Sequence, residues 1–348
     1  MKTFRIKENE AGQRLDKYLK KLLKEAPPAF LYKMLRKKNI VLNQKKANGT
    51  EKLTTGDAVT FYLSDDTFLK FQGGQPSEKT LLTQYPEHPL DVVYEDADCL
   101  IINKPAGLLS QKAKSGDVSA NEYIIGYLLH RNRITPEELA TFKPSVCNRL
   151  DRNTSGLLIA GTTLRGLQEW SEALKSRSLE KYYMALVNGV VEQDGHLKGY
   201  LHKNPSDNRV YISETANTGD GSESSYIETS YEVLEQYRDA SLLKIHLITG
   251  RTHQIRAHLS FIGHPIIGDP KYGIPEINRS WKKKAGVSRQ MLHAYQLSFP
   301  DHPEKRSITA ELPEDFQRAL QYAKAASTAK HKGEDHAYLS DAPRRNRL

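Results

Sequence analysis

Residues 148–158 read Asn-Arg-Leu-Asp-Arg-Asn-Thr-Ser-Gly-Leu-Leu, the densest group of reactive side chains in the chain. Apolar runs precede and follow this stretch, so the pattern predicts two strands joined by a polar turn. Such a turn can project one carboxylate, Asp151, into a cleft. The flanking Arg149 and Arg152 would favour its ionised form. In the competing interpretation Asp151 only caps the turn and pairs with an arginine, and the stretch taken alone favours that interpretation.

A second polar group lies at 249–258, where a strand gives way to a helix, and reads Thr-Gly-Arg-Thr-His-Gln-Ile-Arg-Ala-His. Arg256 can project from the first turns of that helix towards the sheet edge, where an arginine can neutralise a carboxylate or hold a phosphate. The alternative is an ordinary helix start with solvated charges. His253 and His258 have no evident third ligand, and the chain has no Cys-x-x-Cys pair, so we expect no metal site.

The order of the apolar runs predicts an α+β fold. From residue 90 to residue 325 many strands and few helices alternate, which favours a domain built on a large mixed, mostly antiparallel sheet. Residues 64–89 have no apolar period and are expected to be a linker. Residues 326–348 are polar and are expected to form a flexible tail. The first part of the chain, residues 1–63, is expected to be a separate small α/β module of two helices followed by strands.

The charge of the chain is concentrated in that module. Residues 1–62 hold 15 Lys and Arg and six Asp and Glu. The net charge of this segment is therefore +9, the same as the formal net charge of all 348 residues. A localised basic surface suits a polyanion, because each neutralised phosphate releases counterions. A solvated basic face without a partner is the competing interpretation, and the compactness of the charged segment favours nucleic acid.

Composition excludes several classes of protein. With 38% hydrophobic residues the chain can bury a core, yet no run approaches the about 18 apolar residues that a membrane span needs. Two cysteines, Cys99 and Cys147, cannot form a disulfide framework. The start of the chain has no apolar signal sequence, so we expect a cytoplasmic protein.

Several motifs in order resemble the RluA-type pseudouridine synthases over roughly residues 90–315. The motifs are N-K-P-A-G at 103–107, R-L-D-x-x-T-S-G-L at 149–157, K-x-Y-x-A-x-V-x-G at 181–189, G-R-T-H-Q-I-R-x-H-L at 250–259, G-x-P-I-x-G-D at 263–269 and L-H-A at 292–294. Residues 13–62 are similar to the alpha-L RNA-binding module of a ribosomal small-subunit protein, a frequent companion of this family.

The resemblance implies a role for each matched residue. Asp151 would be the essential aspartate, Arg256 the basic residue that pairs with it, and Tyr183 the tyrosine against the target uracil. Leu292 would lie beneath the base, and Arg149 would fill the gap left by the flipped uridine. Arg251 and His253 would shape the pocket wall, the turns at 268–269 and 272–273 would brace it, and Arg36, Lys37 and Lys38 would grip RNA backbone. The family usually has His at 148, where this chain has Asn148.

The implied reaction converts uridine to pseudouridine in RNA. No group enters or leaves, so no cofactor is expected, and the target base must flip out of its stack. Ribosomal RNA of the large subunit is the first expected substrate and transfer RNA the second, with the chain acting as a monomer. The alternative is a non-catalytic RNA-binding or ribosome-assembly protein, which would not need Asp151.

Overall fold

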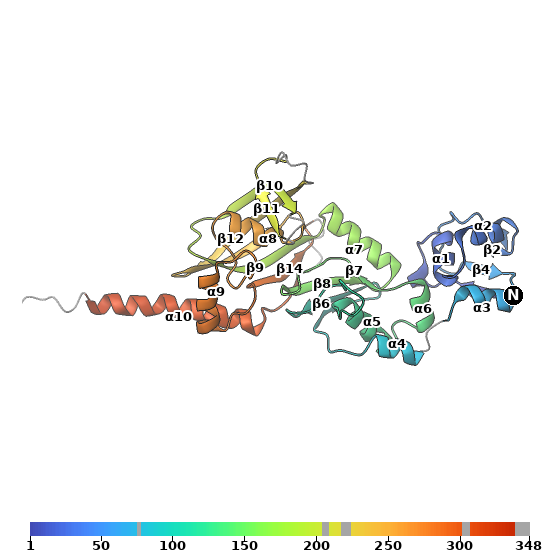
Figure 1. The fold of residues 1–348 in the computed structure, drawn as a ribbon, viewed down its shortest axis with the longest axis horizontal. Helices are drawn as coiled ribbons and strands as arrows, with labels where there is room; N and C mark the ends of the chain where they lie inside the picture. Colours follow the sequence, from blue (N-terminus) through green and yellow to red (C-terminus); the bar gives the residue numbers. More distant parts are fainter. Residues whose placement is uncertain (75–77, 204–208, 217–223, 301–306, 338–348) are drawn as a thin grey trace, which may run out of the picture. The chain divides into compact units, whose positions relative to one another are not determined.

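The computed structural model describes residues 1–74, 78–203, 209–216, 224–300 and 307–337 (Figure 1). The chain forms two compact units, each assembled from several segments. The first unit comprises Met1–Lys104, Leu108–Arg149 and Leu158–Ser176. The second comprises Pro105–Gly107, Leu150–Leu157 and Arg177–Leu348. Strand β8 (Ser155–Gly161) is shared, because its first three residues belong to the second unit and the others to the first.

The first unit begins with a four-stranded sheet in the order β1-β4-β2-β3. Its elements are β1 (Lys2–Arg5), η1 (Glu8–Glu10), α1 (Leu15–Leu22), α2 (Pro28–Arg36), β2 (Ile40–Leu42), β3 (Lys45–Lys46) and β4 (Ala58–Phe61). The apolar side chains of α1 recur every three or four residues and are all buried in one core. Pro28 opens α2, where its missing N–H would have no helical partner. The two predicted helices and the strands at 40 and 58 are confirmed, whereas β1 and β3 were not predicted.

The interval 64–89 carries helices, although the sequence predicts a linker. Helix α3 (Asp65–Gln72) begins after Ser64, whose hydroxyl accepts a hydrogen bond from the Thr67 N–H at 3.3 Å. Phe68 is buried in the N-terminal core against the rings of Phe4 and Phe61. The linker prediction is therefore wrong for residues 64–72, since a helix of two turns is too short to display a clear apolar period. Helix α4 (Glu78–Gln84) follows.

The rest of the first unit surrounds the end of β8. Its elements are β5 (Val92–Glu95), β6 (Cys99–Lys104), α5 (Ala120–His130), α6 (Pro136–Thr141), β7 (Ser145–Val146) and α7 (Leu164–Ser176). Strands β5 and β6 pair antiparallel and form a hairpin, as expected for a mostly antiparallel sheet. Strand β7 pairs antiparallel with β8, as expected for strands joined by the polar turn that holds Asp151.

The second unit is built on a sheet with the strand order β11-β10-β12-β13-β9-β14-β8. Its elements are β9 (Glu180–Asn188), β10 (Gly195–Lys203), β11 (Val210–Ser213), β12 (Ser224–Gln236), β13 (Ala240–Leu247), α8 (Gln254–Phe261), α9 (Pro275–Ala285), β14 (Leu292–Ser298), β15 (Ile308–Thr309) and α10 (Glu314–Ala337). Hydrogen bonding continues through β8 to β6 and β5. Most pairs are antiparallel, and β14 pairs in parallel with β8. The predicted α+β fold with a large, mostly antiparallel sheet is confirmed.

The polar C-terminal segment is helical up to Ala337, although the sequence predicts a flexible tail from 326. Phe316, Ala319 and Ala323 are buried on one side of α10 and anchor the start of this helix. The tail prediction is therefore wrong for residues 326–337, and residues 338–348 lie outside the described part of the chain. Among the helices of the described ranges, none has the length and apolar character of a membrane span.

Candidate active site

Asp151 lies in the turn that leads into β8, within the second unit. The Thr154 N–H donates to the Asp151 carbonyl at 3.0 Å and closes the turn. Two residues further on, Gly156 has φ +113°, and a Cβ there would overlap the backbone of Ala294 on β14. Only glycine permits this close approach, because any other side chain would collide with the neighbouring strand. The turn that holds Asp151 is thereby fixed to the sheet.

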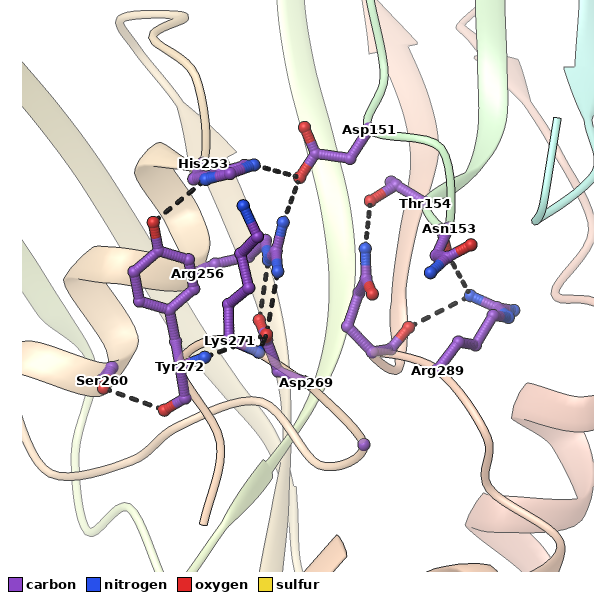
Figure 2. A network of polar contacts seen from close by, with 12 residues as sticks. Asp151, Asn153, Thr154, His253, Arg256, Ser260, Asp269, Lys271, Tyr272 and Arg289 are labelled. Atoms are coloured by element: carbon purple, nitrogen blue, oxygen red, sulfur yellow. Dashed lines mark hydrogen bonds and ion pairs between the residues drawn. The ribbon is translucent and has the colours of Figure 1, made fainter. Parts of the chain in front are cut away.

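Arg256 joins two carboxylates in a network that we call the buried network (Asp151, Arg256 and Asp269; Figure 2). Its Nε and Nη2 donate to the two carboxylate oxygens of Asp269 at 2.7 and 2.8 Å, and its Nη1 donates to Asp151 Oδ2 at 2.7 Å. Arg256 and Asp269 are buried, whereas the Asp151 side chain is 26% exposed. Asp269 thus holds Nε and Nη2 of the guanidinium in a bidentate pair, and the remaining nitrogen, Nη1, orients Asp151.

The charges of the buried network support one another. Burial opposes ionisation of Asp269, yet hydrogen bonds from Arg256 and from the N–H groups of Lys271 and Tyr272 outweigh it and lower the pKa of Asp269. Burial also opposes the charge of Arg256, and the two carboxylates outweigh it and raise the pKa of the guanidinium. Arg256 and Asp269 are therefore both charged at neutral pH, and Asp151 lies against a charged guanidinium.

His253 approaches the same oxygen of Asp151 as Arg256 does, and it takes a left-handed conformation, φ +56°, just before α8. Its Nδ1 is 3.0 Å from the Tyr272 hydroxyl, and its Nε2 is 3.9 Å from Asp151 Oδ2. Burial lowers the pKa of His253, and the attraction of Asp151 offsets only part of that effect. A neutral imidazole therefore lines the site at neutral pH.

Tyr183 is the tyrosine of β9 that faces the buried network. Its side chain is buried, and burial raises the pKa of its hydroxyl, to which the negative charge of Asp151 adds. Within the described part of the chain this hydroxyl forms no hydrogen bond. Tyr182 points to the opposite face, where it stacks on His246 at 4.8 Å and donates to Glu180 at 2.9 Å. The choice of Tyr183 over Tyr182 as the tyrosine near Asp151 agrees with this geometry.

The other predicted site residues lie in two groups. Leu292 is buried at the start of β14, opposite Ala185 of β9, the strand that carries Tyr183. Arg251 is exposed in the turn before α8, and Gln254 Oε1 accepts a hydrogen bond from its N–H at 3.1 Å. The exposed Arg149 belongs to the first unit. So do the exposed Arg36, Lys37 and Lys38 at the C-terminal end of α2, which we call the basic cluster.

Arg289 is a positioning residue that the sequence did not predict. It is buried and forms an ion pair with Asp315 at 2.6 Å. Its Nη1 donates to the carbonyl of Asn153 at 3.1 Å, so it holds the turn of Asp151 from below (Figure 2). No pattern near residue 289 signals this role, because its partners lie 26 and 136 positions away along the chain.

Asn148 replaces the histidine that is usual in the resembling family. Its side-chain Oδ1 accepts a hydrogen bond from the Ile159 N–H at 2.8 Å, within the first unit. This bond links the residues before the turn to strand β8 after it. An asparagine can therefore supply a positioning hydrogen bond here.

Several known proteins are similar to this chain over most of its length. A family model described as RNA pseudouridylate synthase matches residues 98–261. Ribosomal large subunit pseudouridine synthase C of Escherichia coli is 33% identical over 328 residues, covering 92% of this chain and 96% of that protein. Ribosomal large subunit pseudouridine synthase D of Neisseria meningitidis is 32% identical over 316 residues, covering 89% of this chain and 78% of that protein.

A solved structure shares the fold. Human RNA pseudouridylate synthase domain containing 4 superposes with a TM-score of 0.54 and 22% identity, over 74% of this chain and 98% of that chain. Fold, site and relatives define an RNA pseudouridine synthase, an isomerase. Within that class, the chain belongs to the RluA-type family.

Proposed function

We propose that this enzyme converts uridines of large-subunit ribosomal RNA to pseudouridine, with Asp151 as the reacting carboxylate. The RNA target is supported by the names of relatives that align over 78% and 96% of their own lengths. The catalytic assignment rests on one observation: Asp151 is held 2.7 Å from a buried guanidinium and faces Tyr183.

The chemistry needs a carboxylate, an enclosed base and no cofactor. The bond between N1 and C1′ breaks, the uracil turns, and a bond forms between C5 and C1′. The proton lost from C5 is balanced by the proton gained at N1. Asp151 can attack C1′ or remove the 2′ proton, and both routes use the ionised form that Arg256 stabilises.

The surrounding side chains would control the detached base. Leu292 and the Tyr183 ring offer an apolar floor and an aromatic wall, which let uracil rotate without leaving. The Tyr183 hydroxyl forms no hydrogen bond within the described residues, and it would relay the proton from C5 by passing its own proton to Asp151 as it accepts the one from carbon. His253 and Arg251 would shape the wall, and Arg149 would occupy the space left by the flipped nucleotide.

The basic cluster would hold RNA outside the reaction site. Arg36, Lys37 and Lys38 are exposed, so phosphates can reach them without desolvating a buried group. We assign them to backbone contacts that add affinity and no sequence preference. We further propose that the protein acts as a monomer in the cytoplasm.

The test is to map pseudouridines in cellular RNA with and without the gene. One or more sites in large-subunit ribosomal RNA should lose the modification and regain it with the wild-type gene, but not with Asp151→Asn. Loss confined to transfer RNA would overturn the proposed target. Restoration by Asp151→Asn would support the non-catalytic alternative.

A further inference from the structure

Lys181 is a half-buried cation on the strand that carries Tyr183. The two residues are two positions apart on β9, so their side chains leave the same face of the sheet. In the described ranges of the chain, Lys181 forms no hydrogen bond and no ion pair. Burial lowers the pKa of its ammonium group, and the nearby charge of Arg177 adds to the effect. Lys181 therefore places on the Tyr183 face of β9 a positive charge that has no ion-pair partner in the described ranges.

The ammonium group lies beside the stretch that leads to the site. A Cβ built on Gly250 would be 3.6 Å from Lys181 Nζ, so the side chain extends to the backbone of that glycine. Gly250 opens the stretch that supplies His253 and Arg256, the two residues that contact Asp151. Lys181 thus lies at the start of the stretch that builds the buried network, within the second unit.

Other lysines of the same sheet are compensated. Lys244 of β13 lies over the Tyr182 ring at 4.7 Å, and Lys198 of β10 is 3.8 Å from Glu228. Both belong to the face opposite Tyr183, as their pairing registers require. A half-buried ammonium group loses hydration and gains nothing in return unless a ligand supplies an anion.

We infer that Lys181 binds a phosphodiester oxygen of the RNA strand next to the flipped uridine. The inference rests on the proposed function, because it requires that RNA enters this site. Flipping rotates a nucleotide about its backbone, so the flanking phosphates must be held while the base moves. Asp151 and Asp269 both pair with Arg256, which leaves Lys181 available for the substrate.

The experiment uses the full chain and the ribosomal RNA segment in which mapping locates a target. Lys181→Gln should raise KM about tenfold or more while kcat stays within about twofold, because a charge-assisted contact to the ground state is lost. For Lys181→Gln, the slope of log affinity against log salt concentration should be flatter than that of the wild-type enzyme by about 0.7 to 0.9, the amount expected for one phosphate. Lys181→Arg should recover most of the affinity. Lys198→Gln, which removes a charge from the opposite face, should leave KM unchanged.

Removing the charge of single phosphates in the RNA identifies the phosphate that Lys181 contacts. Neutral methylphosphonates are placed singly at the phosphates on both sides of the target. At one of them the wild-type enzyme should lose about tenfold in affinity, whereas Lys181→Gln should lose little more.

The inference is overturned if the losses are additive at every phosphate, or if Lys181→Gln lowers kcat and leaves KM unchanged. A wild-type enzyme that binds this RNA without converting it would overturn the proposed target instead, and the coupling measured on bound RNA would still decide the role of Lys181.

Discussion

The basic cluster in the first unit and the buried network in the second use charge in opposite ways. The cations of the cluster are exposed and hydrated, so each contributes little until a polyanion arrives. The network is held inside the protein by hydrogen bonds of 2.7 to 2.8 Å, and its cation already has two carboxylate partners. The first arrangement suits salt-sensitive binding, and the second suits orientation of one reactive group.

The largest expected effect separates reaction from binding. Asp151→Asn keeps the size of the side chain and removes its charge, so turnover should fall by about 10⁴-fold or more. RNA affinity should stay within about twofold, because the basic cluster is untouched. Single-turnover assays and binding measurements on one RNA would check this. Asp239→Asn, which changes a carboxylate at the surface, is the control; substantial activity of Asp151→Asn would contradict the assignment.

Removing the partner beneath Arg256 should affect stability. Asp269→Asn removes the buried carboxylate of the bidentate pair and leaves Arg256 with only the partly exposed Asp151 as an anionic partner. It should therefore lower the free energy of unfolding by about 3 kcal/mol or more. Glu276→Gln breaks an exposed ion pair, with Arg279, and should change it by less than about 0.5 kcal/mol. Urea unfolding of both variants measures the difference, and equal losses would mean that burial of the network is not what matters.

Acid should destabilise the second unit through two buried histidines. Burial lowers the pKa of His258 and of His293 to about 4, whereas an unfolded histidine titrates near 6.5. The unfolded chain therefore binds more protons below pH 6.5, so stability should fall as pH falls, by about 2 kcal/mol for each histidine between pH 7 and 5. His258→Asn should remove about half of this dependence. An unchanged pH profile of unfolding in that variant would refute the assignment.

Substitutions of the two adjacent tyrosines of β9 show whether only the face that carries Tyr183 takes part in the reaction. Tyr183→Phe keeps the aromatic wall and loses the hydroxyl near Asp151, so turnover should fall by about 10²-fold with binding retained. Tyr182→Phe loses only a surface hydrogen bond to Glu180 and should alter turnover less than twofold. Measured kcat for both variants decides the point. Small and equal effects would indicate that both tyrosines are merely structural.

The smallest expected effect concerns the basic cluster. Replacing Arg36 and Lys37 by Gln and Lys38 by Asn should weaken RNA binding about tenfold at low salt and flatten the salt slope by about 2 to 3. Asparagine is chosen at 38 because that residue has φ +61°. Replacing Lys282, Lys283 and Lys284 of α9 by Gln removes the same charge from the second unit. Equal effects of the two triple variants would show that the cluster has no special place in binding.

The parts of the site that the sequence predicted depend on local order along the chain. The K-x-Y-x-A pattern of the resembling family selects Tyr183, and strand alternation, a local property, then assigns Tyr182 to the opposite face. The pairing of Asp151 with Arg256, 105 positions apart, could be predicted only through the family resemblance. Arg289 has neither kind of signal, because its role is created by the packing of α10 and the turn at 153 against it.

The errors in the fold have a similar origin. Helix α3 is only eight residues long, and its buried Phe68 gains its partners from distant strands. Helix α10 buries the small residues Ala319 and Ala323, and such small side chains give no clear apolar pattern in a polar segment. In both helices the tertiary core decides the structure, and local composition alone predicts a linker or a tail.

The position of Asp151 depends on the absence of a side chain at Gly156. Strand β8 can approach Ala294 only because residue 156 has no Cβ, and this approach fixes the turn of Asp151, the proposed reacting carboxylate. A single added methyl group would push the strands apart at the base of the Asp151 turn, and a shift of about 1 Å in a reacting group can cost about 10²-fold in rate. The chain can therefore lose its chemistry through a change that alters no charge, no hydrogen-bonding group and no residue in contact with RNA.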